Sequence, residues 1–137
     1  MSDRLMVILS APTATGKGTV IRELLSRRED LFVSVSVTTR ETRKDEIDGV
    51  HYHFITDEAF ERLVDAGELL EHAGVWGKRY GSPAAPVREA LERGCDVIFD
   101  IDVQGAYKIR EKHPDCVLIF MVAPTVDSMP TAEMPTP

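Results

Sequence analysis

The stretch LMVILSAPTATGKGT, residues 5–19, decides the fold. Residues 5–9 form a continuous apolar run, which is typical of a strand buried on both faces in a parallel sheet. Residues 16–28 follow with apolar side chains three and four positions apart, which predicts a helix. A loop between a buried strand and a helix can direct backbone N–H groups at an anion, so this order predicts a phosphate-binding loop.

The loop departs twice from the usual pattern G-x-x-x-x-G-K-[ST]. Ala11 replaces the first glycine, and Gly18 replaces the hydroxyl residue that follows the lysine. Ala11 is acceptable if its backbone does not need a positive φ, and Thr19 can supply a hydroxyl one residue later. Lys17 supplies the charge, and the alternative is a helix-start turn with a chance lysine.

The rest of the chain alternates between the two patterns. Strands are expected at residues 32–38, 51–55, 69–75, 95–102 and 116–122, the last two buried, with helices after Thr56 and at 86–93 and 103–112. A Gly-rich turn is expected at residues 76–82. Buried strands that alternate with helices indicate an α/β fold with a parallel sheet, whose ligands bind at the carboxyl ends of the strands.

Composition limits the classes of function. The 137 residues are 43% hydrophobic and 28% charged, with a net charge of −7, which fits one globular domain and disfavours a general nucleic-acid or anionic-membrane surface. Cys95 and Cys116 lack metal-site or redox spacing and are expected to be buried thiols in a reducing cytosol. The four histidines show no metal constellation, and the apolar run at 5–9 is too short for a signal peptide or a membrane span.

Four motifs together resemble the guanylate kinase family. They are SAPTATGKGT (10–19), VSVTTRETRKDEIDGVHYHF (35–54), LLEHAGVWGKRYGS (69–82) and DVIFDIDVQGA (96–106), in the order and spacing of the family. The resemblance runs from about residue 5 to about residue 124. Ala14 stands where the family usually has glycine. The family's continuation, which includes an arginine-bearing lid and elements beside the adenine site, is replaced by a Pro-rich tail.

The resemblance implies a P-loop NTPase-type parallel sheet flanked by helices, with a small mixed α/β GMP-binding insertion. We expect a guanylate-kinase-like domain over residues 1–123, with its core at about 4–35 and 83–123 and the GMP-binding region at about 36–82. Residues 124–137 hold four of the eight prolines and are expected to form a disordered tail.

The resemblance also assigns residues to two nucleotides. For ATP it implies Ala11, Pro12, Thr13, Ala14, Thr15, Gly16, Lys17, Gly18 and Thr19. For GMP it implies Ser36, Arg40, Arg43, Tyr52, Glu71, Tyr80, Ser82 and Asp100. Lys17, Arg40 and Asp100 are the expected catalytic residues.

The chemistry of these side chains suits the assignment. Two guanidinium groups can grip a phosphate bidentately, and a carboxylate such as Glu71 can accept hydrogen bonds from both N1–H and the exocyclic amine of guanine. From the residues alone, Arg40 and Arg43 also fit a solvated loop that pairs with Glu41, Asp45 and Glu46. Glu71 also fits an exposed position on a strand, and Tyr80 also fits packing in the core. Trp76 is expected to pack near the GMP-binding region.

The expected reaction is ATP + GMP giving ADP + GDP in purine nucleotide recycling, with Mg²⁺ as cofactor and a cytoplasmic location. Mg²⁺ is expected to arrive with ATP, and Thr19 and Asp100 are candidate contacts rather than assured ligands. The alternatives are a non-catalytic guanylate-kinase-like binding module, an inactive truncated product, and another small nucleoside monophosphate kinase. The presence of Lys17, Arg40, Arg43 and Glu71 argues against the binding module. Glu71 and the segment TTRETR (38–43) argue against another nucleoside monophosphate kinase.

Overall fold

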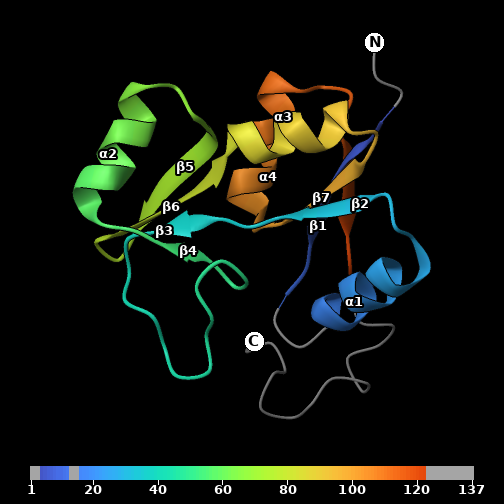
Figure 1. The fold of residues 1–137 in the computed structure, drawn as a ribbon, viewed down its shortest axis with the longest axis horizontal. Coiled ribbons are helices and arrows are strands. Elements are labelled where there is room, and N and C mark those ends of the chain that lie inside the picture. The colour runs from blue at the N-terminus through green and yellow to red at the C-terminus, as the bar shows by residue number, and fades with distance from the viewer. Residues whose placement is uncertain (1–3, 13–15, 123–137) are drawn as a thin grey trace, which may run out of the picture.

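The computed structural model describes residues 4–12 and 16–122, which form two four-stranded sheets side by side (Figure 1). The core sheet has the order β2-β7-β1-β8, with β1 (Met6–Ser10), β2 (Leu31–Ser34), β7 (Asp96–Asp100) and β8 (Val117–Phe120). The second sheet has the order β4-β3-β6-β5, with β3 (Val37–Thr38), β4 (His53–Phe54), β5 (Leu69–Val75) and β6 (Lys78–Pro83).

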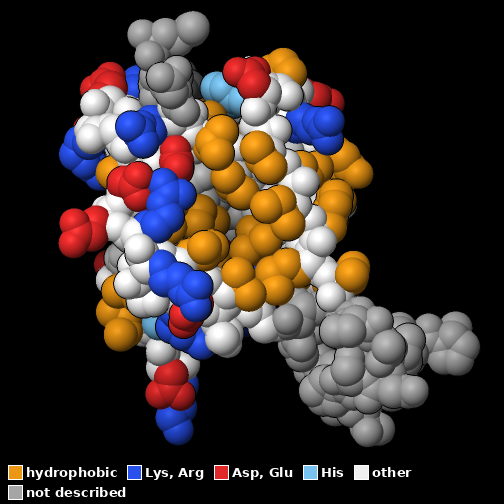
Figure 2. Space-filling model, turned by 90° about the vertical axis from the view of Figure 1, so that its right-hand side faces the viewer, with side chains coloured by type: hydrophobic (Ala, Val, Ile, Leu, Met, Phe, Trp, Pro, Cys, Tyr) orange, Lys and Arg blue, Asp and Glu red, His pale blue; other side chains and the backbone are white. Residues whose placement is uncertain are grey.

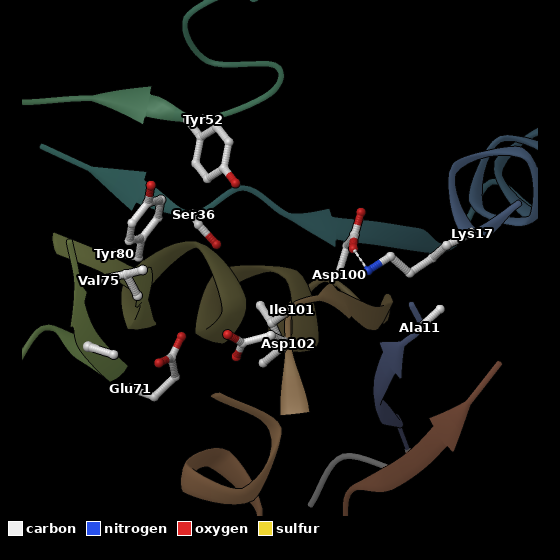
Figure 3. A pocket seen from close by; sticks show the side chains of 11 residues that line it. Ala11, Lys17, Ser36, Tyr52, Glu71, Val75, Tyr80, Asp100, Ile101 and Asp102 are labelled. Carbon is white, nitrogen blue, oxygen red and sulfur yellow. Dashed lines mark ion pairs between the residues drawn. The ribbon is translucent and has the colours of Figure 1, made fainter. Parts of the chain in front are cut away.

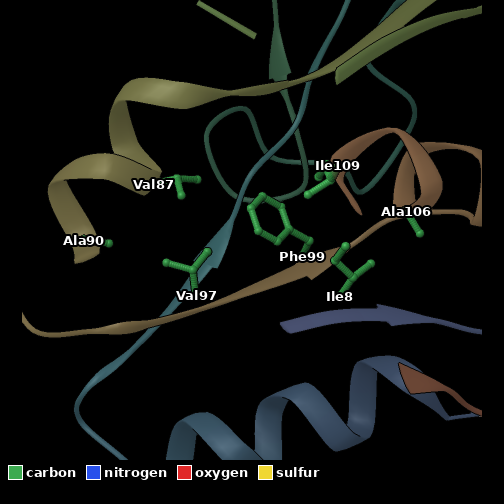
Figure 4. Close-up of a cluster of buried hydrophobic side chains, with 7 residues drawn as sticks. All are labelled: Ile8, Val87, Ala90, Val97, Phe99, Ala106 and Ile109. Atoms are coloured by element: carbon green, nitrogen blue, oxygen red, sulfur yellow. The ribbon is translucent and has the colours of Figure 1, made fainter. Parts of the chain in front are cut away.

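The core sheet is parallel at each of its three pairings and is covered on both faces. On one face, Ile8 of β1 and Phe99 of β7 pack with residues of α3 (Ala84–Glu92) and α4 (Val103–Lys112) (Figure 4). On the other face, Leu9 and Ile98 pack against Ile21 of α1 (Lys17–Arg27). Successive strand residues point to opposite faces, so continuous apolar runs are required, and the predicted α/β fold is confirmed.

The second sheet is mixed and is covered by α2 (Asp57–Asp65). Phe60 of α2 is fully buried against Val37 and Leu69. The helix begins as predicted, because the Thr56 hydroxyl accepts a hydrogen bond from the Ala59 N–H at 3.1 Å. Two lysines of α4 join the sheets, since Lys108 Nζ and Lys112 Nζ donate to backbone carbonyls of β5 at 2.7 and 3.0 Å.

The predicted Gly-rich turn at residues 76–82 is wrong for most of its length. Residues 78–83 form β6, and the turn itself is Trp76-Gly77, with φ values of 53° and 77°. Two consecutive positive φ values match the right-handed twist of the flanking strands. Trp76 is 96% exposed, so the packing expected for its ring is also wrong.

The single strand expected at residues 32–38 is two strands in different sheets. β2 ends at Ser34 in the core sheet, and β3 begins at Val37 in the second sheet. An alternating β-branched run carries no signal for a change of sheet, because both strands use the same period. The crossing places Ser36 at the junction of the two sheets. The predicted helix at 86–93 begins two residues earlier, at Ala84.

The strand predicted at residues 116–122 is present as β8, but the prediction that it is buried is wrong. β8 lies at the edge of the core sheet as far as the described residues extend, and Val117, Ile119 and Phe120 are exposed. Val20 and Leu24 of α1 are exposed as well. Figure 2 shows the hydrophobic side chains gathered on the face that is seen from the right of Figure 1.

Cys95 and Cys116 are free thiols and half-buried. No helix in the described ranges has both the length and the apolar character needed to cross a bilayer.

Candidate functional site: a cavity between the two sheets

A cavity of about 410 Å³ lies between the two sheets, beyond the carboxyl ends of β1 and β7. Its lining comprises Ala11, Lys17, Ser36, Tyr52, Glu71, Ala73, Val75, Tyr80, Asp100, Ile101 and Asp102. Figure 3 shows Lys17 and Ala11 at one end, Glu71 and Tyr80 at the other, and Asp100 to Asp102 between them. The carboxyl edge of a parallel sheet is where α/β folds bind ligands. Seven of the sequence-derived site residues meet there.

The Lys17 end begins at the start of α1. Gly16 is the N-cap with φ 86°, a backbone conformation that residues with a Cβ rarely adopt. Lys17 is the first residue of the helix, and its Nζ lies 2.6 Å from Asp100 Oδ1. Among the described residues no side chain caps the helix, so its first N–H groups can bind an anion.

The structure explains one of the two unusual loop positions, Ala11, and gives no steric reason for the glycine at position 18. Ala11 is not among the described residues with positive φ, so the missing glycine costs no backbone strain. A Cβ at Gly18 would lie 3.4 Å from Arg22 Nη1. Thr19 is exposed, and its hydroxyl accepts a hydrogen bond from Arg22 Nη2 at 3.3 Å. Pro12 is the last described residue before the gap, and the expected ATP contacts Thr13, Ala14 and Thr15 lie outside the described residues.

At the opposite end, Glu71 of β5 is 8% exposed. The buried Ser82 hydroxyl donates to Glu71 Oε1 at 3.0 Å. α4 approaches closely because residue 105 is glycine, whose added Cβ would lie 3.3 Å from the Glu71 carboxyl group. Burial raises the pKa of Glu71 above its ordinary value, against the opposing hydrogen bond from Ser82. The alternative of an exposed strand glutamate is therefore excluded.

The middle of the cavity is formed by side chains from both sheets. Tyr52 and Tyr80 lie edge to face, with ring centroids 6.1 Å apart, and both line the cavity. Figure 3 shows Ser36 between these rings and Asp102. Tyr80 therefore does not serve core packing alone.

The two candidate phosphate-binding arginines differ in environment. Arg40 is 8% exposed, and its guanidinium carbon lies 5.0 Å from the centroid of the Tyr52 ring. Arg40 does not itself line the cavity, but it contacts a residue that does. Arg43 is exposed, and its side chain makes no hydrogen bond to a described residue. The alternative of a solvated loop residue therefore holds for Arg43 and is wrong for Arg40.

Two residues have a larger role than the sequence indicates. Asp102 lines the cavity and caps α4, since its Oδ1 accepts a hydrogen bond from the Gly105 N–H at 2.9 Å. Glu46 forms a two-point ion pair with Arg40. The helix predicted at residues 103–112 makes Asp102 its expected N-cap. The sequence gives no reason to choose Glu46 over Glu41 or Asp45 as the partner of Arg40.

Comparisons with known proteins agree on one family. The guanylate kinase family profile matches residues 3–134. Guanylate kinase of Clostridium perfringens (strain SM101 / Type A) is 44% identical over 124 residues, which cover 90% of this chain and 57% of the relative. Guanylate kinase of Carboxydothermus hydrogenoformans is 45% identical over 126 residues, which cover 92% and 62%.

A solved structure shows the same fold. The crystal structure of guanylate kinase from Anaplasma phagocytophilum has a TM-score of 0.74 and 38% sequence identity, and the match covers 93% of this chain and 64% of that one. This chain therefore spans about three fifths of the length of the relatives it matches. Because the family profile covers nearly the whole sequence, the chain belongs to the guanylate kinase family.

Proposed function

We propose that this chain binds GMP at the Glu71 end of the cavity and ATP at the Lys17 end, and that it belongs to an enzyme that transfers the γ-phosphoryl group of ATP to GMP. The observation that carries this proposal is the cavity itself. It joins a lysine at a helix N-terminus to a buried carboxylate at the opposite end. Such a space suits two nucleotides that meet at their phosphates.

The Glu71 end suits guanine. Guanine presents N1–H and an exocyclic amine side by side, and an ionised Glu71 can accept a hydrogen bond from both. Ser82 fixes the carboxylate through Oε1. Adenine presents no such donor pair, and a buried carboxylate without donors costs about 1–3 kcal/mol. This difference makes the site selective for GMP over AMP.

The phosphate of GMP is placed near Tyr52, Arg40 and Arg43. Arg40 is already held against the Tyr52 ring, and Arg43 is free of side-chain hydrogen bonds to described residues and can turn towards the ligand. Arginine suits this role because its planar donors match two phosphate oxygens.

The reaction needs positioning and charge more than proton transfer. An oxygen of the GMP phosphate attacks the γ-phosphorus of ATP, the bond from that phosphorus to the β–γ bridging oxygen breaks, and ADP and GDP result. The attacking oxygen is already anionic, so no general base is required. Lys17 and Arg40 neutralise the charge on the transferring group.

Mg²⁺ is proposed as the cofactor that arrives with ATP. The described residues contain no group of three or more His, Cys, Asp or Glu that could hold a metal ion. The Asp100 carboxylate and the Thr19 hydroxyl offer oxygen atoms, the donor type that Mg²⁺ prefers, and this ion commonly binds through one or two carboxylates plus phosphate oxygens and water. When bound, it would neutralise phosphate charge. The proposed location is the cytoplasm, where both nucleotides are available.

The rival interpretation is a binding module without catalysis. Lys17 favours the enzyme, because a module that had lost phosphoryl transfer would have no use for a lysine paired with Asp100 at the ATP end.

The test is thermal unfolding of the chain with GMP and with AMP. GMP at a hundredfold excess over its Kd should stabilise the fold by about 2.7 kcal/mol, and AMP should give no shift. Equal stabilisation by the two nucleotides would refute the assignment of Glu71 as the guanine-binding residue.

A further inference from the structure

The loop between β3 and β4, residues 39–52, contains an internal ion pair with unusually complete geometry. Glu46 Oε1 and Oε2 accept hydrogen bonds from Arg40 Nη1 and Nη2, both at 2.7 Å. Glu46 Oε1 also accepts the backbone N–H of Arg43 at 2.8 Å, and the Glu46 N–H donates to the Arg43 carbonyl at 3.1 Å. One carboxylate therefore fixes both the Arg40 guanidinium and the backbone that carries Arg43.

Arg40 is held on its remaining sides as well. Nη1 donates to the Glu41 carbonyl at 2.9 Å, and the guanidinium lies against the rings of Tyr52 and Phe54, 5.0 and 5.6 Å from their centroids. A guanidinium this deeply buried is unfavourable without a paired anion. The two-point pair with Glu46 supplies that anion, and it also lowers the pKa of Glu46 to about 2, so the pair stays charged at neutral pH.

The pairing leaves one edge of the guanidinium for a ligand. Arginine has five N–H donors. Both hydrogens of Nη1 and one hydrogen of Nη2 are used within the loop. Nε–H and the second hydrogen of Nη2 are not used within the loop, and they form a fork along one side of the guanidinium plane that suits two phosphate oxygens. The guanidinium also interacts with the side chain of Tyr80, which lines the cavity, so a phosphate would meet Arg40 beside the Tyr80 hydroxyl or in its place.

We propose that Glu46 is a positioning residue that orients Arg40 so that the edge not bonded within the loop, beside Tyr80, meets the phosphate of the acceptor nucleotide. This inference rests on the proposed function. Glu46 does not touch the nucleotide. It acts through Arg40, and its effect is confined to the phosphate and does not extend to the base. Guanosine, which lacks the phosphate, is therefore the probe that separates this role from a general role in folding.

The test compares the Kd values of GMP and guanosine for the 137-residue chain and its variants, by calorimetry for GMP and by NMR titration for guanosine. Glu46→Gln places an amide donor against a guanidinium donor, so GMP should bind about tenfold or more weakly. The Kd of guanosine should stay within about twofold, because the contacts to the base are unchanged. Glu46→Asp keeps the charge and should lose less affinity for GMP than Glu46→Gln.

The matched control is Glu41→Gln, which makes the same charge change in the same loop. The Glu41 side chain is exposed, and the Arg40 contact uses its backbone carbonyl, so the Kd of GMP should stay within about twofold. An unchanged Kd of GMP in Glu46→Gln would overturn the inference. A tighter Kd would also overturn it, because Glu46 would then compete with the phosphate. Equal losses of GMP and guanosine would show a general role in folding. If the unaltered chain binds guanosine but not GMP, or neither, the proposed function itself fails.

Discussion

The two ends of the cavity differ in how far the chain's own contacts fix them before any nucleotide binds. At the GMP end, Glu71 is buried and bonded to Ser82, and Arg40 is buried and paired with Glu46. At the ATP end, Lys17 has a single ion pair with a described residue, and that partner is an Asp100 side chain that is 41% exposed. α1, which begins at that end, and β8, at the edge of the core sheet, carry exposed apolar residues. Preorganised charges are worth more than charges that must be ordered on binding, so we expect the GMP end to work better than the ATP end in this chain.

The largest expected effect is on turnover. Lys17 is the one basic residue in the described lining of the cavity, which also contains three carboxylates. Loss of a single arginine that neutralises the transferring phosphoryl group costs about 10³–10⁵ in rate in related reactions. The 137-residue chain should therefore turn over at least about a thousandfold more slowly than the Clostridium perfringens relative. A steady-state assay that detects GDP measures this turnover. A rate of about 10 s⁻¹ would show that the ATP end already has the positive charge that catalysis needs.

The next prediction separates the two ends with Lys17→Met. Removing this charge should weaken ATP by about tenfold or more, since hydrogen bonds to charged groups contribute about 1.5–3 kcal/mol. GMP binding should be nearly unchanged, because its main proposed contacts, Glu71, Arg40 and Arg43, lie in the second sheet and its 39–52 loop. Calorimetric titration of each nucleotide provides the measurement. Lys78→Met, on the exposed start of β6, is the matched control. A variant that loses GMP and keeps ATP would reverse the assignment of the ends.

Glu71→Gln tests the base contact. The amide replaces one acceptor by a donor that faces a donor of guanine, so GMP should weaken by about 1–3 kcal/mol. Glu89→Gln, on the exposed side of α3, should leave the Kd of GMP unaltered. If Glu71→Gln retains full affinity for GMP, the carboxylate does not bind guanine.

The pH dependence of guanosine binding sharpens the same point. Burial raises the pKa of Glu71, so the folded chain without ligand holds this proton more tightly than the unfolded chain does. The protonated side chain therefore contributes to the stability of the fold at low pH, and this contribution is lost as the pH rises through the folded pKa. Guanine needs the ionised form. The affinity for guanosine should therefore fall as the pH drops through that raised pKa, and the dependence should disappear in Glu71→Gln. Guanosine avoids the titration of the GMP phosphate, and a pH-independent Kd in the unaltered chain would contradict this account.

The smallest expected effect lies outside both ends, in the turn between β5 and β6. Trp76 has a φ of 53° and is almost fully exposed, so its side chain contributes little packing to offset an unfavourable backbone conformation. Trp76→Asn creates Asn-Gly, the preferred pair for this turn. The melting temperature should rise by a few degrees at most, with unchanged GMP affinity. A large loss of stability would mean that the ring packs in a way its exposure does not show.

The sequence predicts β1 and β7, the two central strands of the core sheet, because each is marked by an apolar run, and it predicts the helices by their period. The loop at residues 10–19, the cap at Thr56 and the acids after β7 follow from local patterns of this kind. The break between β2 and β3 does not follow from a local pattern, because it depends on which sheet each of the two strands joins. The exposure of β8 depends on its position at the edge of the sheet, which no local pattern encodes.

The candidate site divides in the same way. Lys17 and Asp100 are predictable because Lys17 follows the buried strand β1 and Asp100 ends the buried strand β7, and the carboxyl ends of both strands lie at the ligand-binding edge. The burial of Glu71 is not, since it depends on the close approach of α4 at Gly105. The choice of Glu46 as the partner of Arg40 depends on the path of the 39–52 loop, which contains four acidic residues.

The most direct test of the contrast between the two ends is calorimetric titration of the same 137-residue chain with GMP and, separately, with ATP and Mg²⁺. The account predicts saturable GMP binding that is at least about tenfold tighter than ATP binding, because the GMP contacts are already in place. A chain that binds ATP as tightly as GMP, or that binds ATP alone, would contradict it.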